Sequence, residues 1–215
     1  MPPIHAVLFD YGLVLSGPPD PTAWARMRSI TGLSEDLLHR GYWAHRHAYD
    51  RGELSGVRFW QTVGHDGNLL LTPTQIEFLL AADIDLWGQV NQPMLEWAQS
   101  LQRAGIPTGI LSNMGDAMET GLLARYPWIQ DFGHHTWSHR LNLAKPEAAI
   151  YHHAAQGMNT PAPNILFVDD RIDNIHAAHA VGMQAIQYLS HQTFLAEMET
   201  RYLTYLLNPT VLQRG

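Results

Sequence analysis

Two apolar segments that lie far apart in this chain each end in aspartate. Residues 4–9 (Ile-His-Ala-Val-Leu-Phe) precede Asp10, and residues 165–168 (Ile-Leu-Phe-Val) precede Asp169 and Asp170. A carboxylate at the end of a buried strand can serve as a nucleophile or as a metal ligand. If the two strands are neighbours, the three carboxylates converge and repel, and a divalent cation such as Mg²⁺ relieves that repulsion. We therefore expect one acidic site, although an isolated aspartate at such a boundary more often caps a loop or a helix.

Two further segments carry groups that can bind phosphate. Ser112 and Asn113 follow an apolar run and precede a helix expected to begin near Asp116. Ser112 and nearby backbone N–H groups could hold phosphate oxygens at the N-terminus of that helix, or the segment could be an ordinary capped loop. Lys145, the only lysine in the chain, precedes Pro146 at the expected start of another helix. It could place a fixed positive charge against a phosphoryl group or a carboxylate, or it could be a solvated surface side chain.

These residues need secondary structure that brings them together. From residue 93 onward, short apolar strands alternate with helices of about ten residues, which favours a parallel, doubly wound α/β sheet with three layers. Ligands of such sheets bind beyond the carboxyl ends of the strands. Residues 16–88 predict only helices, so we divide the chain into a Rossmann-like core (1–15 and 89–215) and an inserted α-helical domain (16–88). The expected strands are 4–9, 107–111, 133–137, 165–168 and 184–188, the expected helix before the fourth strand is 146–156, and the last helix is 194–207.

Composition and charge exclude several classes of protein. The chain has 215 residues, of which 46% are apolar, so a substantial core is possible and wholesale disorder is not expected. A formal net charge of -7 argues against broad nucleic-acid binding. The absence of cysteine excludes disulfides, thiolate chemistry and cysteine-ligated zinc. No apolar run approaches the roughly 20 residues that cross a bilayer, and no leader-like segment is present. We therefore expect a cytoplasmic protein without nucleic-acid or membrane partners.

The motifs together resemble those of the haloacid dehalogenase-like (HAD) hydrolase superfamily over nearly the whole chain. The first motif, a strand that ends in a nucleophilic aspartate, corresponds to residues 9–15 (Phe-Asp-Tyr-Gly-Leu-Val-Leu). The second corresponds to Ser112, the third to Lys145 and the fourth to residues 168–174 (Val-Asp-Asp-Arg-Ile-Asp-Asn). The helical insert after the first motif looks like the small α-helical cap of one large subgroup, and the chain resembles sugar-phosphate phosphatases of that subgroup.

The resemblance implies an Mg²⁺-dependent phosphatase that acts on a small phosphomonoester, with a sugar phosphate as the leading candidate. Asp10 would attack phosphorus and form an aspartyl-phosphate, which water then hydrolyses. Asp10, the carbonyl of Gly12 and Asp170 would hold Mg²⁺, with Asp169 close by. The protein would be a monomer or a homodimer.

The resemblance also assigns the groups that contact phosphate. Ser112, Asn113 and Lys145 would bind the phosphoryl group that is transferred, and Asn174 would orient Lys145 or the acidic pair. Their main task is to stabilise negative charge that spreads over the phosphoryl oxygens.

One position departs from the family pattern. Most phosphatases of this superfamily carry a second aspartate two residues after the nucleophile, which gives a proton to the leaving group and takes one from water. Here that position is Gly12, and the next, usually glycine, is Leu13. Dehalogenases also lack this aspartate, because a halide needs no proton. A 2-haloacid dehalogenase that uses Asp10 as nucleophile and a non-catalytic ligand-binding protein are therefore the alternatives. Asp169 and Asp170 favour the phosphatase, because dehalogenases work without a metal.

The helical insert carries the candidates for substrate selection. In caps of this superfamily, side chains that face the core usually choose the substrate. Trp43, Arg46 and His47 are the candidates on the second helix of the insert, and a histidine there could replace the missing proton donor. The alternative is that Trp43 packs within the cap and the histidines are solvated. Two histidine pairs, 134–135 and 152–153, lack the acidic and turn context of a zinc helix, so we expect structural roles for them.

Overall fold

One parallel sheet forms the centre of the protein. The structure is a computed structural model that describes residues 2–209, so residues 1 and 210–215 of the expected core lie outside the described residues. The strand order is β3-β2-β1-β4-β5. This order puts β1 between β2 and β4, so the segments that carry Asp10, Ser112 and Asp169 are direct neighbours. The strands are β1 (Ala6–Phe9), β2 (Thr108–Ser112), β3 (His134–Trp137), β4 (Ile165–Asp169) and β5 (Gln184–Gln187).

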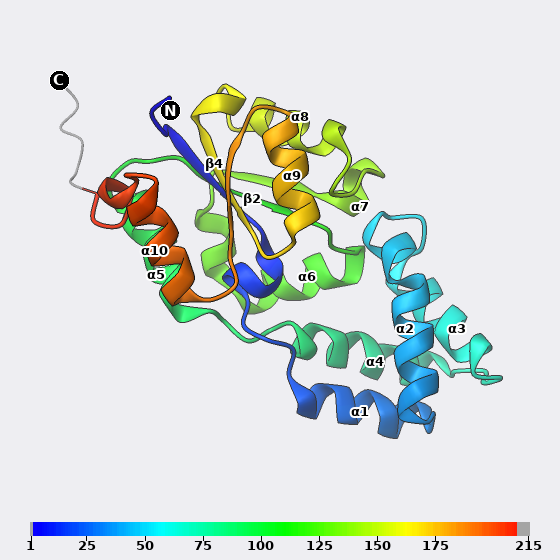
Figure 1. The fold of residues 1–215 in the computed structure, drawn as a ribbon. Coiled ribbons are helices and arrows are strands. Elements are labelled where there is room, and N and C mark those ends of the chain that lie inside the picture. Colours follow the sequence, from blue (N-terminus) through cyan, green and yellow to red (C-terminus); the bar gives the residue numbers. More distant parts are fainter. Residues whose placement is uncertain (1, 210–215) are drawn as a thin grey trace.

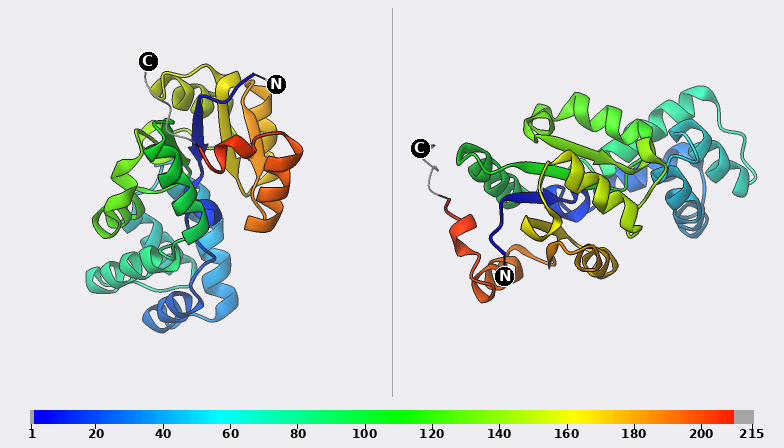
Figure 2. Two further views of the ribbon diagram at one scale, coloured as in Figure 1. Left: turned by 90° about the vertical axis from the view of Figure 1, so that its left-hand side faces the viewer. Right: turned by 90° about the horizontal axis from the view of Figure 1, so that it is seen from above.

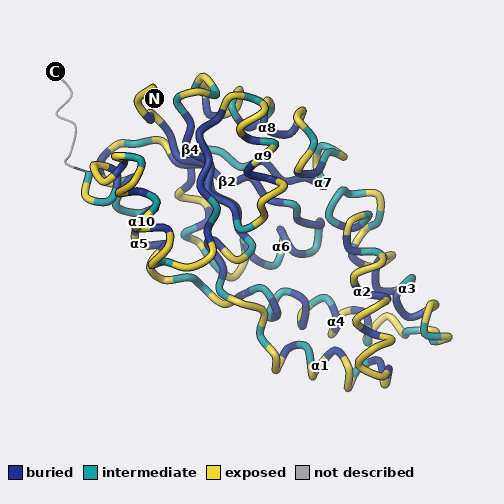
Figure 3. Tube along the Cα trace, viewed as in Figure 1, coloured by how far each residue is buried: buried dark blue, intermediate teal, exposed yellow. Residues whose placement is uncertain are grey.

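Helices cover both faces of this sheet, as expected for a doubly wound α/β fold. The helices of this part are α5 (Gln92–Arg103), α6 (Asp116–Arg125), α7 (Ser138–Leu141), α8 (Ala148–Gly157), α9 (Ile172–Ala180) and α10 (His191–Thr200). Side chains of β1 alternate between the faces: Val7 and Phe9 pack with α5 and α10, whereas Ala6 and Leu8 pack with α8 and α9. The three central strands β2, β1 and β4 are buried throughout, whereas β3 and β5 at the edges each contain partly buried residues (Figure 3). The three-layer α/β/α core is therefore confirmed.

Four of the five α-helices between β1 and β2 form a separate layer. They are α1 (Pro21–Thr31), α2 (Glu35–Asp50), α3 (Gly56–Asp66) and α4 (Pro73–Leu86). Asp20, Ser34, Ser55 and Thr72 cap their N-termini through side-chain hydrogen bonds. Helix α1 packs on α4, and α2 packs on α3. Figures 1 and 2 show these helices at one end of the sheet, with α10 towards the other end.

The segments that enter and leave this helical layer run side by side. Ser16 and Val90 form an antiparallel bridge, and the Asn91 N–H donates to the carbonyl of Leu15 at 2.9 Å. We keep residues 16–88 as a proposed domain with its boundary at this bridge. Within residues 2–209, no helix is both long and apolar enough to cross a membrane.

Some expected boundaries were wrong. The expected last helix, 194–207, is instead α10, which begins at His191 and ends at Thr200, with a 3₁₀ turn at 204–206. Its early start follows from a capping box between Ser190 and Thr193, and Tyr202 with a φ of 58° prevents its continuation. The expected helix 146–156 begins at residue 148, because a turn at 144–147 precedes it. The short α7 was not expected.

Candidate active site

Asp10 is held at the end of β1 by its backbone and by one carboxylate oxygen. Its N–H donates to the carbonyl of Val168 on β4 at 2.9 Å, which fixes the residue to the sheet. Its Oδ1 accepts the Tyr11 N–H at 2.7 Å and lies 2.9 Å from Lys145 Nζ. Its Oδ2 has no hydrogen-bond partner among the described residues and faces a cavity. Asp10 is therefore fixed through one oxygen and has the other available for a nucleophilic attack.

The chain turns sharply after Asp10. The Ser16 N–H donates to the carbonyl of Tyr11 at 2.7 Å, which closes a wide turn over Tyr11–Leu15. Gly12 has an extended conformation, with φ of -62° and ψ of 127°. Leu13 has a φ of 57°, in the left-handed region that favours glycine, which accounts for the glycine usual at this position in the HAD motif. A Cβ built on Gly12 meets no atom within 4 Å, so the space beside Asp10 is open there.

Lys145 joins two of the predicted carboxylates. Its buried ammonium group lies 2.9 Å from Asp10 Oδ1 and 2.6 Å from Asp169 Oδ2. Burial opposes its charge, but these two carboxylates raise the pKa of Lys145 above its ordinary value, so it is protonated at neutral pH. The only lysine of the chain is therefore a buried counter-charge.

Asp169 is an anchor for its neighbours. Asn174 Nδ2 donates to both of its oxygens, at 2.9 and 3.0 Å, and the Arg171 N–H donates to Oδ1 at 2.8 Å. With Lys145 on Oδ2, this fully buried carboxylate is bonded on both sides. Asn174 therefore holds Asp169, and its predicted role in orienting the acidic pair or Lys145 stays a prediction.

Asp170 is half-buried and accompanies Asp10 and Asp169 in one cluster. One carboxylate oxygen from each of the three lies within 4.8 Å of the others. Burial raises the pKa of Asp170, and the charge of Asp169 adds to the effect. Burial also raises the pKa of Asp10 to about 7; Lys145 opposes this rise, and Asp169 and Asp170 increase it. One ammonium group among three carboxylates leaves an excess of negative charge, and hard oxygen donors in this arrangement fit a divalent cation such as Mg²⁺.

Ser112 and Asn113 lie beside this cluster at the end of β2. Both line the cavity. The Asn113 amide makes two hydrogen bonds with the backbone of Lys145: Nδ2 donates to the carbonyl at 3.0 Å, and Oδ1 accepts the N–H at 2.8 Å. The direct effect of Asn113 is therefore to position Lys145. Its predicted contact with phosphate stays a prediction.

A cavity of about 470 Å³ connects the acidic cluster to the helical layer. This volume is typical of a small-molecule site. Helix α2 contributes the three predicted side chains to its wall. Trp43 and His47 are exposed, whereas Arg46 is buried. The residues that line the cavity from the helical layer are Trp43, Arg46, His47, Asp50 and Trp87.

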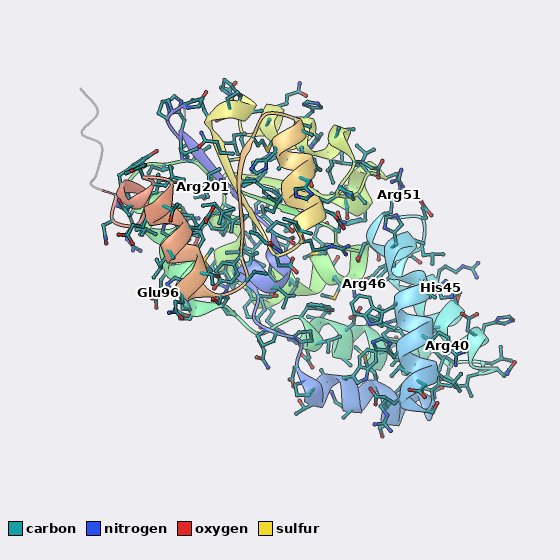
Figure 4. The ribbon with its side chains drawn as sticks, viewed as in Figure 1. Arg40, His45, Arg46, Arg51, Glu96 and Arg201 are labelled. Carbon is teal, nitrogen blue, oxygen red and sulfur yellow. The ribbon has the colours of Figure 1, made fainter. Side chains whose placement is uncertain are left out.

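The charge of Arg46 is already paired within the helical layer. Its Nε donates to Asp50 Oδ1 at 2.8 Å, Nη1 lies 3.4 Å from Asp83 Oδ1, and the Tyr42 hydroxyl also accepts from it. Three aromatic rings surround the guanidinium at 5.4 to 5.8 Å. Figure 4 shows Arg46 on the side of α2 that faces α4, opposite to Arg40 and His45. Arg46 therefore joins α2 to α4 within the helical layer, and its role in substrate selection stays a prediction.

Asp50 and Asp83 were not identified from the sequence. Trp43, Arg46 and Asp50 are spaced i, i+3 and i+7, which places them on one face of α2. That spacing could have identified Asp50 from the sequence. Asp83 lies on α4, and only the packing of α2 and α4 brings it to Arg46.

The chain is similar to part of two longer curated proteins. It is 21% identical over 185 residues to a drimenol cyclase of Aspergillus calidoustus, which covers 86% of this chain and 34% of that protein. It is 25% identical over 220 residues to bifunctional epoxide hydrolase 2 of Sus scrofa, which covers 91% of this chain and 38% of that protein. The chain thus spans little more than a third of these relatives.

Solved structures share the whole architecture. A HAD family enzyme from Bacteroides thetaiotaomicron has a TM-score of 0.76 at 16% identity and covers 91% of this chain and 99% of its own. The same enzyme was solved with magnesium and inorganic phosphate (TM-score 0.73, 18% identity, 89% and 98% covered). An L-2-haloacid dehalogenase from Xanthobacter autotrophicus, with chloropropionic acid covalently bound, has a TM-score of 0.65 at 17% identity, with 95% and 86% covered. At these identities the likeness establishes the fold and does not choose between the two chemistries.

The family itself follows from the sequence. The family model for haloacid dehalogenase-like hydrolases matches residues 43–182, which is more than half of the chain. With the carboxylates and the lysine converging at one sheet edge, this match identifies the chain as a member of the haloacid dehalogenase-like hydrolase family.

Proposed function

We propose that this protein is an Mg²⁺-dependent phosphatase that hydrolyses a small phosphomonoester through an aspartyl-phosphate on Asp10. The observation that carries the proposal is the cluster of Asp10, Asp169 and Asp170 around a single buried lysine. A carboxylate nucleophile replaces one difficult displacement by two easier ones. The free Oδ2 of Asp10 faces the cavity and can attack phosphorus, while Oδ1 stays fixed.

Mg²⁺ suits the donors that surround Asp10. Asp10, the Gly12 carbonyl and Asp170 would hold it, and Asp169 is largely occupied by Lys145 and Asn174. The ion would neutralise charge on the phosphoryl oxygens during transfer. The related enzyme that binds both magnesium and phosphate supports this assignment.

Ser112 and Lys145 are the proposed contacts of the phosphoryl group. Both line the cavity beside Asp10. Asn113 and Asn174 support them, because Asn113 holds the backbone of Lys145 and Asn174 holds Asp169. The positive charge of Lys145 is placed where negative charge develops, and electrostatic stabilisation of this kind is usually the largest catalytic contribution.

The helical layer is the proposed cap, and its cavity wall is the proposed site of substrate selection. Trp43 offers an aromatic surface and His47 a polar group to the part of the substrate beyond the phosphate. A sugar phosphate is the leading candidate, because a ring with hydroxyl groups fits an aromatic and polar wall of this size. A cytoplasmic location is part of the same proposal.

A 2-haloacid dehalogenase is the second candidate, supported by the fold shared with dehalogenases and by the glycine at position 12. In that chemistry Asp10 attacks carbon and forms an ester. Phosphate release from a panel of sugar phosphates and nucleotides, with and without EDTA, separates the two. Halide release that survives complete removal of metal refutes the phosphatase.

The role of Asp10 has its own test, which also addresses a non-catalytic protein. Beryllium trifluoride with Mg²⁺ mimics the aspartyl-phosphate, so it should bind the folded wild-type protein and fail to bind Asp10→Asn. Asp10→Asn should also abolish phosphate release. Turnover retained in this variant contradicts the nucleophile, and failure to trap folded wild-type protein favours a non-catalytic role.

A further inference from the structure

Among the described residues that line the cavity from the core, the only carboxyl groups are those of the acidic cluster, and Lys145 is held between Asp10 and Asp169. An alkoxide leaves phosphorus readily only when an acid gives it a proton during bond cleavage. Gly12, two residues after Asp10 in the turn, has no side chain, and a Cβ there would meet no atom within 4 Å. Asp10 is the proposed nucleophile, Asp169 is paired with Lys145, and Asp170 is a proposed ligand of the cation. The donor therefore has to enter this open space from the cap.

Asp50 is the carboxyl group that the cap presents to this cavity. It ends α2, and its side chain is 14% exposed. Oδ1 accepts from Arg46 Nε at 2.8 Å. Oδ2 accepts no hydrogen bond from any described residue, yet it is not among the buried unpartnered atoms, so it is open to the cavity. One oxygen of Asp50 is thus fixed and the other is free to exchange a proton.

The backbone of Asp50 is hydrogen-bonded to the core beside the loop that follows β2. Its carbonyl accepts a hydrogen bond from the Ser138 hydroxyl. The same hydroxyl accepts the Met114 N–H at 2.8 Å, and Met114 follows Ser112 and Asn113. Ser138 therefore links the end of α2 to the loop at the end of β2. This link places Asp50 at the cap–core interface rather than in the interior of the cap.

The charged and buried surroundings of Asp50 give it a pKa that suits a group that both donates and accepts a proton. The charged groups around it are Arg46 and His47 on α2 and Asp83 on α4. Burial raises the pKa of Asp50 to about 6, with Arg46 opposing and Asp83 adding to the rise. A carboxyl group in this range is populated in both protonation states near neutral pH, which is what proton transfer in two directions requires.

We propose that Asp50 is the general acid and base of the phosphatase reaction, in place of the side chain that Gly12 lacks; this proposal rests on the proposed function. In the first step Asp10 Oδ2 forms a bond to phosphorus, and the leaving oxygen departs with the electron pair of its P–O bond. The proton on Asp50 Oδ2 passes to that oxygen. In the second step Asp50 takes a proton from water as the water oxygen attacks phosphorus. The bond from Asp10 to phosphorus breaks, its electron pair returns to the Asp10 carboxylate, and phosphate leaves.

Leaving groups of different basicity test this assignment. A p-nitrophenolate leaves without a proton, whereas the alkoxide of glycerol phosphate needs one. In Asp50→Asn, glycerol phosphate should phosphorylate Asp10 about 10²- to 10⁴-fold more slowly than in wild type. With p-nitrophenyl phosphate the same variant should give a burst of one p-nitrophenol per site and then a slow steady state, because only the water step lacks its base. Asparagine keeps an Oδ1 acceptor for Arg46; if melting shows that this variant is unfolded, Asp50→Ser serves for the same measurement.

A second experiment places a carboxyl group at position 12, to replace the acid that Asp50→Asn lacks. Gly12 has a backbone conformation that aspartate adopts freely, and its Cβ space is empty. Gly12→Asp in the Asp50→Asn background should therefore restore phosphorylation by glycerol phosphate. Asp66→Asn, an exposed matched change on α3, should leave both substrates unaffected.

Three results overturn the proposal while phosphatase activity of the wild type stands. In the first, Asp50→Asn slows phosphorylation of Asp10 equally with both substrates. In the second, Asp50→Asn slows it with neither substrate. In the third, His47→Gln, and not Asp50→Asn, slows phosphorylation by glycerol phosphate alone. A wild-type protein that releases phosphate from neither substrate nor from any sugar phosphate, with Mg²⁺ present, refutes the proposed function itself.

Discussion

The affinity for Mg²⁺ should depend on pH through Asp10. Burial raises the pKa of Asp10 from 3.8 to about 7 in the metal-free protein, so below that pH the carboxyl group is protonated. A cation needs the carboxylate, and therefore binding must displace the proton. The affinity for Mg²⁺ is therefore highest above the pKa that Asp10 has in the folded protein, and it decreases as the pH falls through this value. Well below the pKa, it decreases by about tenfold for each pH unit.

The pKa of Asp10 determines how strongly the Mg²⁺ affinity depends on pH. Between about pH 8 and about pH 5.5, one group with a pKa of about 7 weakens Mg²⁺ binding about 30-fold. The raised pKa of Asp170 acts in the same direction, so 30-fold is a lower limit. The two carboxyl groups are coupled, and the measured dependence belongs to the pair.

Isothermal titration calorimetry with MgCl₂ measures this dependence directly. Titrations in two buffers of different ionisation enthalpy at about pH 6 should also show that roughly one proton is released per Mg²⁺ bound. Asp10→Asn keeps an oxygen donor but cannot titrate, so its pH dependence should shrink to the part due to Asp170. An affinity in wild type that changes less than about threefold over this range, with no proton release, refutes the reasoning.

Three further substitutions test the buried contacts. Asn174→Ala removes two hydrogen bonds from buried Asp169 and should lower the free energy of unfolding by about 1–3 kcal/mol, measured with urea. Lys145→Met leaves Asp10 and Asp169 without a counter-charge. It should lower the free energy of unfolding by about 3–5 kcal/mol at pH 8 and by less at pH 5, where Asp10 is protonated. An equal loss at both pH values argues against the pairing. Arg46→Met leaves two cap carboxylates unpaired and should cost a similar amount, whereas Arg40→Met on the exposed side of α2 should stay within about 0.5 kcal/mol by thermal melting.

The sheet and the positions of the motifs could be predicted because both follow from local pattern. A short apolar run that ends in a polar residue predicts a buried parallel strand, and parallel strands place those residues on one edge. Asp10 and Asp169 therefore had to meet once β1 and β4 were neighbours. The ends of helices without glycine or proline were harder: nothing local marks Thr200 as the last residue of α10, since Tyr202 takes up a left-handed conformation without being glycine or asparagine.

The partners of each site residue depend on packing, which sequence pattern does not contain. Lys145 could be singled out, but its pairing with both Asp10 and Asp169 needed the strand order. Arg46 was expected to face the substrate because caps of this superfamily usually select the substrate. Side chains of α2 and α4 meet here: Asp83 lies 3.4 Å from the Arg46 guanidinium, which is buried in the wall of the cavity.

The glycine at position 12 has a consequence for how the cap and the chemistry are connected. A proton donor in the turn after the nucleophile would move with the core, so a cap movement would leave the acid in place. Asp50 belongs to the helical layer that we propose as the cap, and the Ser138 hydroxyl joins its carbonyl to the loop that carries Ser112. If Asp50 is the acid, the site is complete only while this contact holds, and opening of the cap removes the base that water needs. The aspartyl-phosphate would then persist until the cap returned, and hydrolysis would be confined to the closed protein.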